Sequence, residues 1–161
     1  LPLYIVCGDH LLAAKLRRAN IDASAGATEE VARITAQIRA RWPRVKILLR
    51  ADSGFARDEL MAWCEANKVD FLFGLARNAR LVDHIHVDLA WAEDEAERTG
   101  RPARRFADFR WRTLDSWSRK RRVVAKAEWM PGRGERGANP RLNVTSLPAA
   151  EIGARALYER L

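Results

Sequence analysis

One short stretch combines a carboxylate with a turn where α/β proteins commonly hold ligands. The aliphatic run Val45 to Leu49 predicts a buried strand, and Ala51-Asp52-Ser53-Gly54 ends it. Open α/β sheets place ligand sites just past the carboxyl ends of their strands, so Asp52 would face that crevice. A carboxylate fixed there can bind a hard divalent cation such as Mg²⁺. The alternative is an ordinary turn, in which Asp52 bonds only to its own backbone.

The histidines and cysteines give weaker signals. His84 and His86 fall in a predicted helix, where they would point apart, so no metal site is expected there. Cys7 and Cys64 are too few for a disulfide framework and are typical of a reducing cytoplasm. We expect both to be small buried hydrophobic residues.

The elements around Asp52 alternate between helix and strand. We predict a hairpin over 2–17, a helix capped by Thr28 and ended by Pro43, a helix over 57–67, a strand over 69–75, and a further helix capped by Asn78. This order indicates α/β layering with parallel neighbouring strands.

The sequence changes character near Gly100. Residues 104–114 and 119–130 alternate arginine with apolar residues, which predicts strands with one wet, basic face. A glycine-rich loop, a short strand over 142–146 and a helix starting near residue 149 follow. We therefore expect a β-rich segment over 101–147.

The positive charge is concentrated in that segment. The chain has a net charge of +8, whereas residues 101–147 contain 13 basic and 4 acidic residues, a net +9. Such asymmetry favours a polyanionic partner such as nucleic acid, although a solvated arginine-rich surface is the alternative. The candidate DNA-binding residues are Arg104, Arg105, Arg110, Arg112, Arg119, Lys120, Arg121 and Arg122.

The remaining features bound the class of protein. No apolar run reaches the ~18 residues of a membrane span, and no signal segment opens the chain, so we expect a cytoplasmic protein without a membrane partner. The chain starts in an apolar run without Met and stops in a helical pattern at Leu161. We interpret it as a piece of a longer protein.

Several stretches, in order along nearly the whole chain, resemble one family. These are Leu1-Pro2-Leu3-Tyr4-Ile5-Val6-Cys7-Gly8-Asp9-His10, Asn20-Ile21-Asp22-Ala23-Ser24-Ala25-Gly26, Arg50-Ala51-Asp52-Ser53-Gly54-Phe55, Phe73-Gly74-Leu75-Ala76-Arg77-Asn78, and Asp115-Ser116-Trp117-Ser118-Arg119-Lys120-Arg121-Arg122-Val123-Val124-Ala125-Lys126-Ala127-Glu128. They are similar to bacterial insertion-sequence DDE transposases of group 1 type, which have a ribonuclease H-like catalytic domain.

The resemblance makes Asp52 the central acid of the DDE triad. The family reads Arg-Gly-Asp-Ser-Gly-Phe where this chain has Ala51 in place of the first glycine. The family's first Asp would lie upstream of Leu1 and its Glu downstream of Leu161, because Glu159 lacks the family spacing. The resemblance thus implies that two of three metal ligands are outside this chain.

The resemblance also implies a fold and an organisation. The fold would be α/β, a truncated ribonuclease H-like mixed sheet flanked by helices, with a β-rich insertion. Residues 1–100 would form the central part of the catalytic core, 101–147 the basic insertion, and 148–161 the start of the C-terminal catalytic helix region. A further strand, upstream of Leu1, would lie between the hairpin and the strand that leads to Asp52.

The implied activity is DNA transposition. The enzyme would cleave transposon ends and transfer strands to target DNA by two-metal phosphoryl transfer with Mg²⁺ or Mn²⁺, as a homo-oligomer in a nucleoid-associated synaptic complex. This chain alone would be inactive. Two alternatives are a non-catalytic DNA-binding relic of a mobile element and a Mg²⁺-dependent phosphohydrolase that uses Asp52 with a second strand-end acid.

Overall fold

The computed structural model describes residues 1–160, apart from the side chains of Glu135 and Arg160. The strands are β1 (Pro2–Cys7), β2 (His10–Leu16), β3 (Leu48–Ala51), β4 (Asp70–Leu75), β5 (Ala103–Trp111), β6 (Arg121–Trp129) and β7 (Arg141–Thr145). The α-helices are α1 (Ala27–Arg41), α2 (Asp58–Ala66), α3 (Ala79–His84), α4 (His86–Thr99) and α5 (Ala154–Arg160). Short 3₁₀ turns are η1 (Ser53–Phe55), η2 (Leu114–Ser116) and η3 (Gly134–Gly137).

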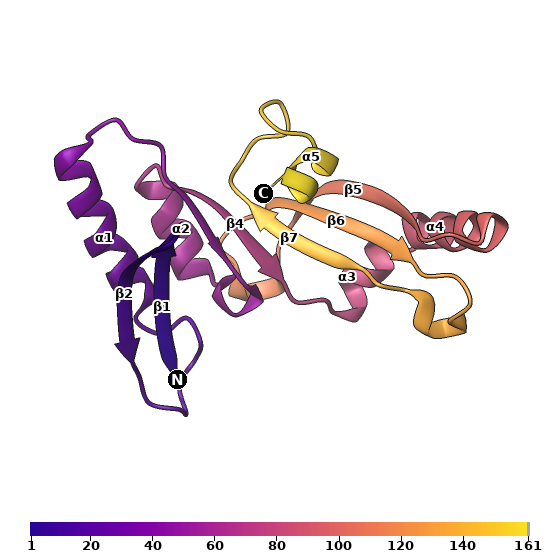
Figure 1. Cartoon of the computed structure of the whole chain (residues 1–161), viewed down its shortest axis with the longest axis horizontal. Coiled ribbons are helices and arrows are strands. Elements are labelled where there is room, and N and C mark those ends of the chain that lie inside the picture. The colour runs from indigo at the N-terminus through magenta and orange to yellow at the C-terminus, as the bar shows by residue number, and fades with distance from the viewer. Residues whose placement is uncertain (161) are drawn as a thin grey trace.

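A mixed sheet of five strands organises most of the molecule (Figure 1). Its order is β3-β4-β7-β6-β5, in which β3 and β4 are parallel and the other neighbours are antiparallel. The predicted α/β class is therefore confirmed, and this helix-flanked mixed sheet is consistent with a ribonuclease H-like fold.

Apolar side chains cover both faces of the sheet. On one face, Phe71 and Val123 belong to a core that includes Leu60 of α2 and Leu81 of α3. On the other face, Leu72 and Val124 pack with Leu157 of α5. Because central strands are covered from both sides, β4 is a nearly continuous apolar run rather than an alternating one.

The prediction of a wet basic face was wrong for β6. All nine of its residues are buried, including Arg121, Arg122, Lys126 and Glu128. β6 lies between β5 and β7, and helices cover both faces at this position, so its charged side chains are enclosed by the fold. The strands of 101–147 thus continue the same sheet that contains β3 and β4.

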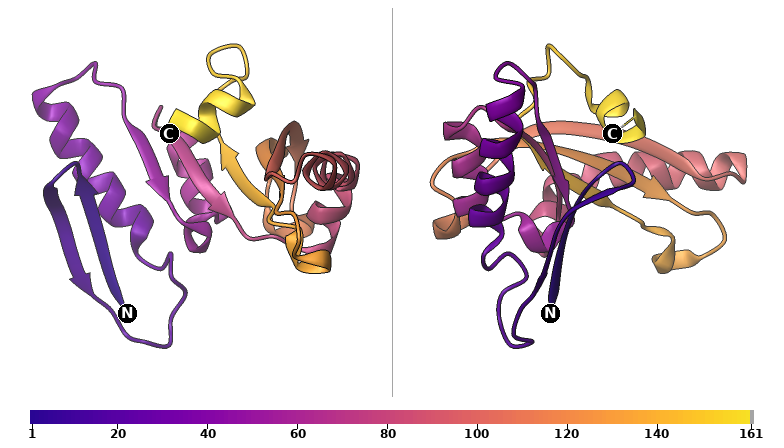
Figure 2. Two further views of the ribbon diagram at one scale, coloured as in Figure 1. Left: turned by 45° about the vertical axis from the view of Figure 1, so that its right-hand side comes forward. Right: turned by 60° about the vertical axis from the view of Figure 1, so that its left-hand side comes forward.

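The β1–β2 hairpin lies beside α1, away from the five-stranded sheet (Figure 2). Leu3 is buried, whereas Tyr4 and Val6 are exposed. A cleft of about 860 Å³ separates β1 from β3 and is lined by residues 3–8 and 48–51. Within the described residues, β1 pairs only with β2 and β3 only with β4, so each presents an unpaired edge. The strand that the resemblance places between them remains a prediction.

The helix starts show which local signals were decisive. The predicted Thr28 cap was wrong, because α1 begins at Ala27 after Gly26, whose φ of 73° forms the entry turn. The Asn78 cap is confirmed, since its side chain accepts a hydrogen bond from the Leu81 N–H at 3.0 Å.

Of the two cysteines, Cys64 is buried as predicted, and burial raises the pKa of its thiol to about 12. The prediction of a buried Cys7 was wrong, because Cys7 is exposed.

Candidate active site at the carboxyl ends of β3 and β4

Asp52 directly follows β3 and caps the 3₁₀ turn that comes next. Its Oδ1 accepts a hydrogen bond from the Gly54 N–H at 2.8 Å, and its backbone is extended. The residue is exposed to solvent. The carboxylate is therefore held through one oxygen and open to a ligand, at the place predicted from the sequence.

Two glycines allow the backbone to approach Asp52 closely. A Cβ at Gly74 of β4 would lie 3.0 Å from the Ser53 nitrogen and 3.4 Å from the Asp52 carbonyl carbon. A Cβ at Gly54 would lie 3.0 Å from the Asp52 Oδ1 and 3.1 Å from the Ala23 Cβ. Since L side chains rarely make such short contacts, larger residues at either position would displace the Asp52 turn.

A polar pocket of about 490 Å³ opens beside Asp52. Its lining comes from η1, the end of β4, the start of β7 and α5, and includes Arg77, Arg141, Asn143 and Tyr158. Among the described lining residues Asp52 is the only acid. The phosphohydrolase alternative needs a second strand-end acid, and this pocket does not supply one.

Sequence reasoning missed Arg77 and Arg141. Arg77 comes just after β4, and Asp52 comes just after β3. Because parallel neighbouring strands end at the same edge of a sheet, this position in the sequence could have predicted that Arg77 lies near Asp52. Arg141 is brought there by the antiparallel pairing of Leu142 with Leu75. That pairing joins distant parts of the chain and has no local signature.

The described residues do not complete a metal site by themselves. No group of three or more His, Cys, Asp or Glu side chains that could bind an ion occurs among them. Asp52 can offer one carboxylate, whereas Mg²⁺ requires about six oxygen ligands. The histidines have other neighbours: the His84 ring lies 4.2 Å from that of Phe109, and the His86 Nδ1 lies 2.7 Å from the Asp83 carbonyl oxygen.

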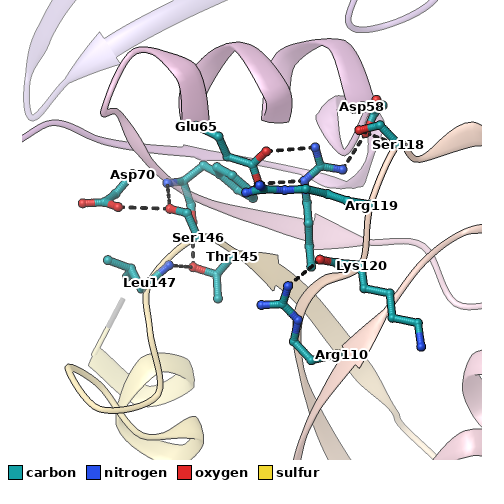
Figure 3. Close-up of polar contacts among 12 residues, drawn as sticks. Asp58, Glu65, Asp70, Arg110, Ser118, Arg119, Lys120, Thr145, Ser146 and Leu147 are labelled. Atoms are coloured by element: carbon teal, nitrogen blue, oxygen red, sulfur yellow. Dashed lines mark hydrogen bonds and ion pairs between the residues drawn. The ribbon is translucent and has the colours of Figure 1, made fainter.

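Arg121 and Arg122 are enclosed in ion pairs. Arg121 donates to Glu65 and Asp58 of α2, whose carboxylates are shown in Figure 3. Arg122 donates to Asp108 and to two carbonyl oxygens, those of Leu147 and Ile152. Their side chains are buried and bound to these partners, so neither offers its charge at the surface, unlike the other predicted DNA-binding residues.

Hydrogen bonds lower the pKa of two acids, Asp58, which pairs with Arg121, and Glu128, which pairs with the buried Lys126. Burial raises the pKa of Asp58, but hydrogen bonds from Arg121 and Ser118 outweigh this effect and hold it below its ordinary value. Likewise, burial opposes ionisation of Glu128, and hydrogen bonds from Lys126 and Asn139 lower its pKa. These charges stabilise the fold in their ionised forms.

The other six candidate residues are exposed. Arg104, Arg105 and Arg119 each form an ion pair, with Glu128, Asp88 and Glu65 respectively. Arg110 donates to the Lys120 carbonyl oxygen, as Figure 3 shows, and Arg112 to that of Leu114. Four strand spacings of ~4.8 Å separate β3 from β5, so Arg110 lies roughly 19 Å across the sheet from Asp52.

The helix-flanked mixed sheet, with Asp52 directly after β3, makes this an α/β domain that is consistent with a ribonuclease H-like fold. The family model described as transposase DDE domain group 1 matches residues 1–161, and the chain belongs to that family. No curated protein matches the chain. Among the described residues, no helix combines the length and apolarity needed to cross a membrane.

Proposed function

We propose that this chain supplies part of the active site of a DNA transposase that cleaves transposon ends and joins them to target DNA. Asp52 is the central acid of that site. The observation that carries the proposal is an exposed carboxylate fixed at the end of β3 in a chain of the DDE family. The pocket beside it provides room and positive charge for a nucleic acid strand.

The proposed cofactors are two Mg²⁺ or Mn²⁺ ions, with Asp52 as one ligand. Such ions activate the attacking oxygen and stabilise the leaving oxygen in phosphoryl transfer. Because the resemblance assigns the other two acids to positions outside 1–161, we expect residues 1–161 alone to be inactive. The residues of this chain would position DNA and hold one carboxylate.

The proposed DNA surface consists of the six exposed candidates Arg104, Arg105, Arg110, Arg112, Arg119 and Lys120. Contacts to phosphates position the duplex without reading its sequence. In this proposal, residues 101–147 are the insertion that binds DNA, and residues 1–100 and 148–161 are parts of the catalytic core. The insertion and the core contribute strands to the same five-stranded sheet. The assembled enzyme would be a homo-oligomer on the nucleoid.

The test is Asp52→Asn in a transposition assay with the native gene. Asparagine keeps the hydrogen bond from Gly54 and removes the charge, so we expect transposition to fall by more than the ~10–100-fold typical of outer-shell metal partners. Asp9→Asn, an exposed acid in the hairpin turn, is the matched control and should retain activity.

The isolated chain offers a second readout. Residues 1–161 should not nick duplex DNA with Mg²⁺ or Mn²⁺. Metal-dependent nicking that disappears in Asp52→Asn would show that the site is complete within this chain. Full transposition by Asp52→Asn would contradict the role of Asp52 itself.

A further inference from the structure

Arg77 and Arg141 leave the sheet side by side. Leu75, the last residue of β4, pairs with Leu142 of β7, so Arg77 just beyond it and Arg141 at the start of β7 lie at the same end. Both line the polar pocket that also contains Asp52. Two guanidinium groups from distant parts of the chain therefore border one carboxylate.

These two side chains differ from most arginines of β5, β6 and the turn between them. Arg77 and Arg141 are exposed, and neither has a hydrogen bond or ion pair to any side chain that the structure describes. In contrast, five arginines of β5, β6 and the turn between them, Arg104, Arg105, Arg119, Arg121 and Arg122, each pair with an acid. Guanidinium groups without internal acids are available to an external anion.

Neutral hydrogen-bonding groups complete the lining. Asn143 and Tyr158 are half-buried and face the same pocket. The Tyr158 ring is held against Phe106, with ring centroids 5.7 Å apart, and the Lys126 Nζ lies 5.3 Å from its centroid. Tyr158 is thereby fixed at the rim as the pocket's aromatic side chain.

The charge of the lining selects the ligand. Two arginines and one aspartate give the described lining a net positive charge, which matches a singly charged phosphodiester next to an ionised carboxylate. Guanidinium groups bind phosphate oxygens through paired N–H donors, which fixes geometry as well as charge. Asp52 would repel such a phosphate if these arginines did not compensate for it.

We propose that Arg77 and Arg141 form a phosphodiester-binding site that places a DNA strand beside Asp52. The DNA identity of the ligand rests on the proposed function, whereas the anion site rests on the pocket. This site does not include the exposed cations of β5, because Arg141 on β7 lies two strand spacings, roughly 10 Å, from β5, and Arg77 follows β4, one spacing further away.

The test is a titration of the ¹⁵N-labelled chain with a thymidine hexanucleotide, followed by amide chemical shifts. We expect the largest shifts at Ser53, Gly74 and Asn143, all in the pocket lining. The double variant Arg77→Gln/Arg141→Gln should raise the Kd at least about tenfold, because charge-assisted hydrogen bonds to phosphate are strong. The matched control, Arg41→Gln/Arg44→Gln, removes two exposed arginines, the last residue of α1 and one in the turn after it, and should leave the Kd within about twofold.

Three outcomes would overturn the inference: shifts confined to Arg110–Lys120, a Kd unchanged in the double variant, or inorganic phosphate binding as tightly as the hexanucleotide. The proposed function can fail separately. If Asp52→Asn leaves transposition intact while the arginine variants weaken binding, the anion site stands and the catalytic assignment falls. If Asp52→Asn abolishes transposition while the arginine variants bind normally, the catalytic assignment stands and the anion site falls.

Discussion

The pocket beside Asp52 and the region where β5 meets β6 both contain arginines and acids, in opposite arrangements. Beside Asp52 the arginines are exposed and separate from their acid, whereas Arg121 and Arg122 are buried in ion pairs. The segment with the highest charge in the sequence thus uses part of that charge for its own stability. A count of arginines therefore overestimates the positive charge that a surface offers to DNA.

Breaking the buried pairs should have the largest effect. In Arg121→Gln, the carboxylates of Asp58 and Glu65 lose their shared partner, and we expect a loss of about 3 kcal/mol in the free energy of unfolding. The value is at the low end for buried pairs because 27% of the Asp58 side chain is exposed. Urea denaturation of the chain measures this change.

The matched variant for that experiment is Arg110→Gln/Lys120→Gln. Both side chains are exposed, so we expect stability to change by less than ~0.5 kcal/mol. The same variant should weaken duplex binding and flatten its salt dependence, the slope falling by roughly 0.9 for each phosphate that is no longer neutralised. If Arg121→Gln instead weakened DNA binding and left stability unchanged, Arg121 would serve DNA binding rather than the stability of the fold.

A smaller effect is expected at the Asp52 end from Gly74→Ala. The added methyl group would meet the Ser53 nitrogen at 3.0 Å, a backbone atom that cannot move freely. We expect a cost of about 2 kcal/mol and a displaced Asp52 turn. Gly153→Ala is the control, because nothing lies within 4 Å of a Cβ there. Equal stability of the two variants would mean that the close approach of β4 does not hold the turn.

The smallest expected effect is a loss of stability in acid. The folded-state pKa values of Asp58 and Glu128 lie below their ordinary values of 3.8 and 4.5, so the folded chain binds fewer protons than the unfolded one. Their contribution is complete above those ordinary values and is lost as the pH falls through the lower folded values. Urea midpoints from pH 6 to pH 3 should show this loss, and Glu128→Gln should reduce it. A flat profile below pH 4.5 would argue against ionised pairs.

Local patterns predicted the position of Asp52 well. The aliphatic run before it, the turn residues after it and the α2 pattern all depend on neighbours in the sequence, and the structure has a strand before Asp52, a turn after it and a helix at α2. The prediction of a buried strand was wrong, because the residues of β3 are half-buried or exposed. The strand lies later than the predicted Val45–Leu49, because the residues that pair with β4 are Leu48–Ala51. The Gly26 entry to α1 was missed because Thr28 offered a competing local signal.

Features that depend on long-range pairing could not be predicted. The sequence of β6 alternates charged and apolar residues, which is typical of a strand with one exposed face. Arg121 and Arg122 are buried because β6 lies between β5 and β7, which the sequence does not indicate. Arg141 joins the pocket through the register of β7 on β4, which no local spacing specifies. The family, in contrast, could be predicted from the sequence, because the resemblance rests on many short stretches in order along the chain and does not depend on how the strands pair.

The pairing of β7 with β4 also sets the order in which the site is completed during synthesis. Chains emerge from the ribosome N-terminus first, so β3, the Asp52 turn, α2 and β4 are made together. Arg141 emerges only after α3, α4, β5 and β6. The nascent chain therefore carries its carboxylate before it acquires the second arginine, and the proposed anion site would form only when β7 docks.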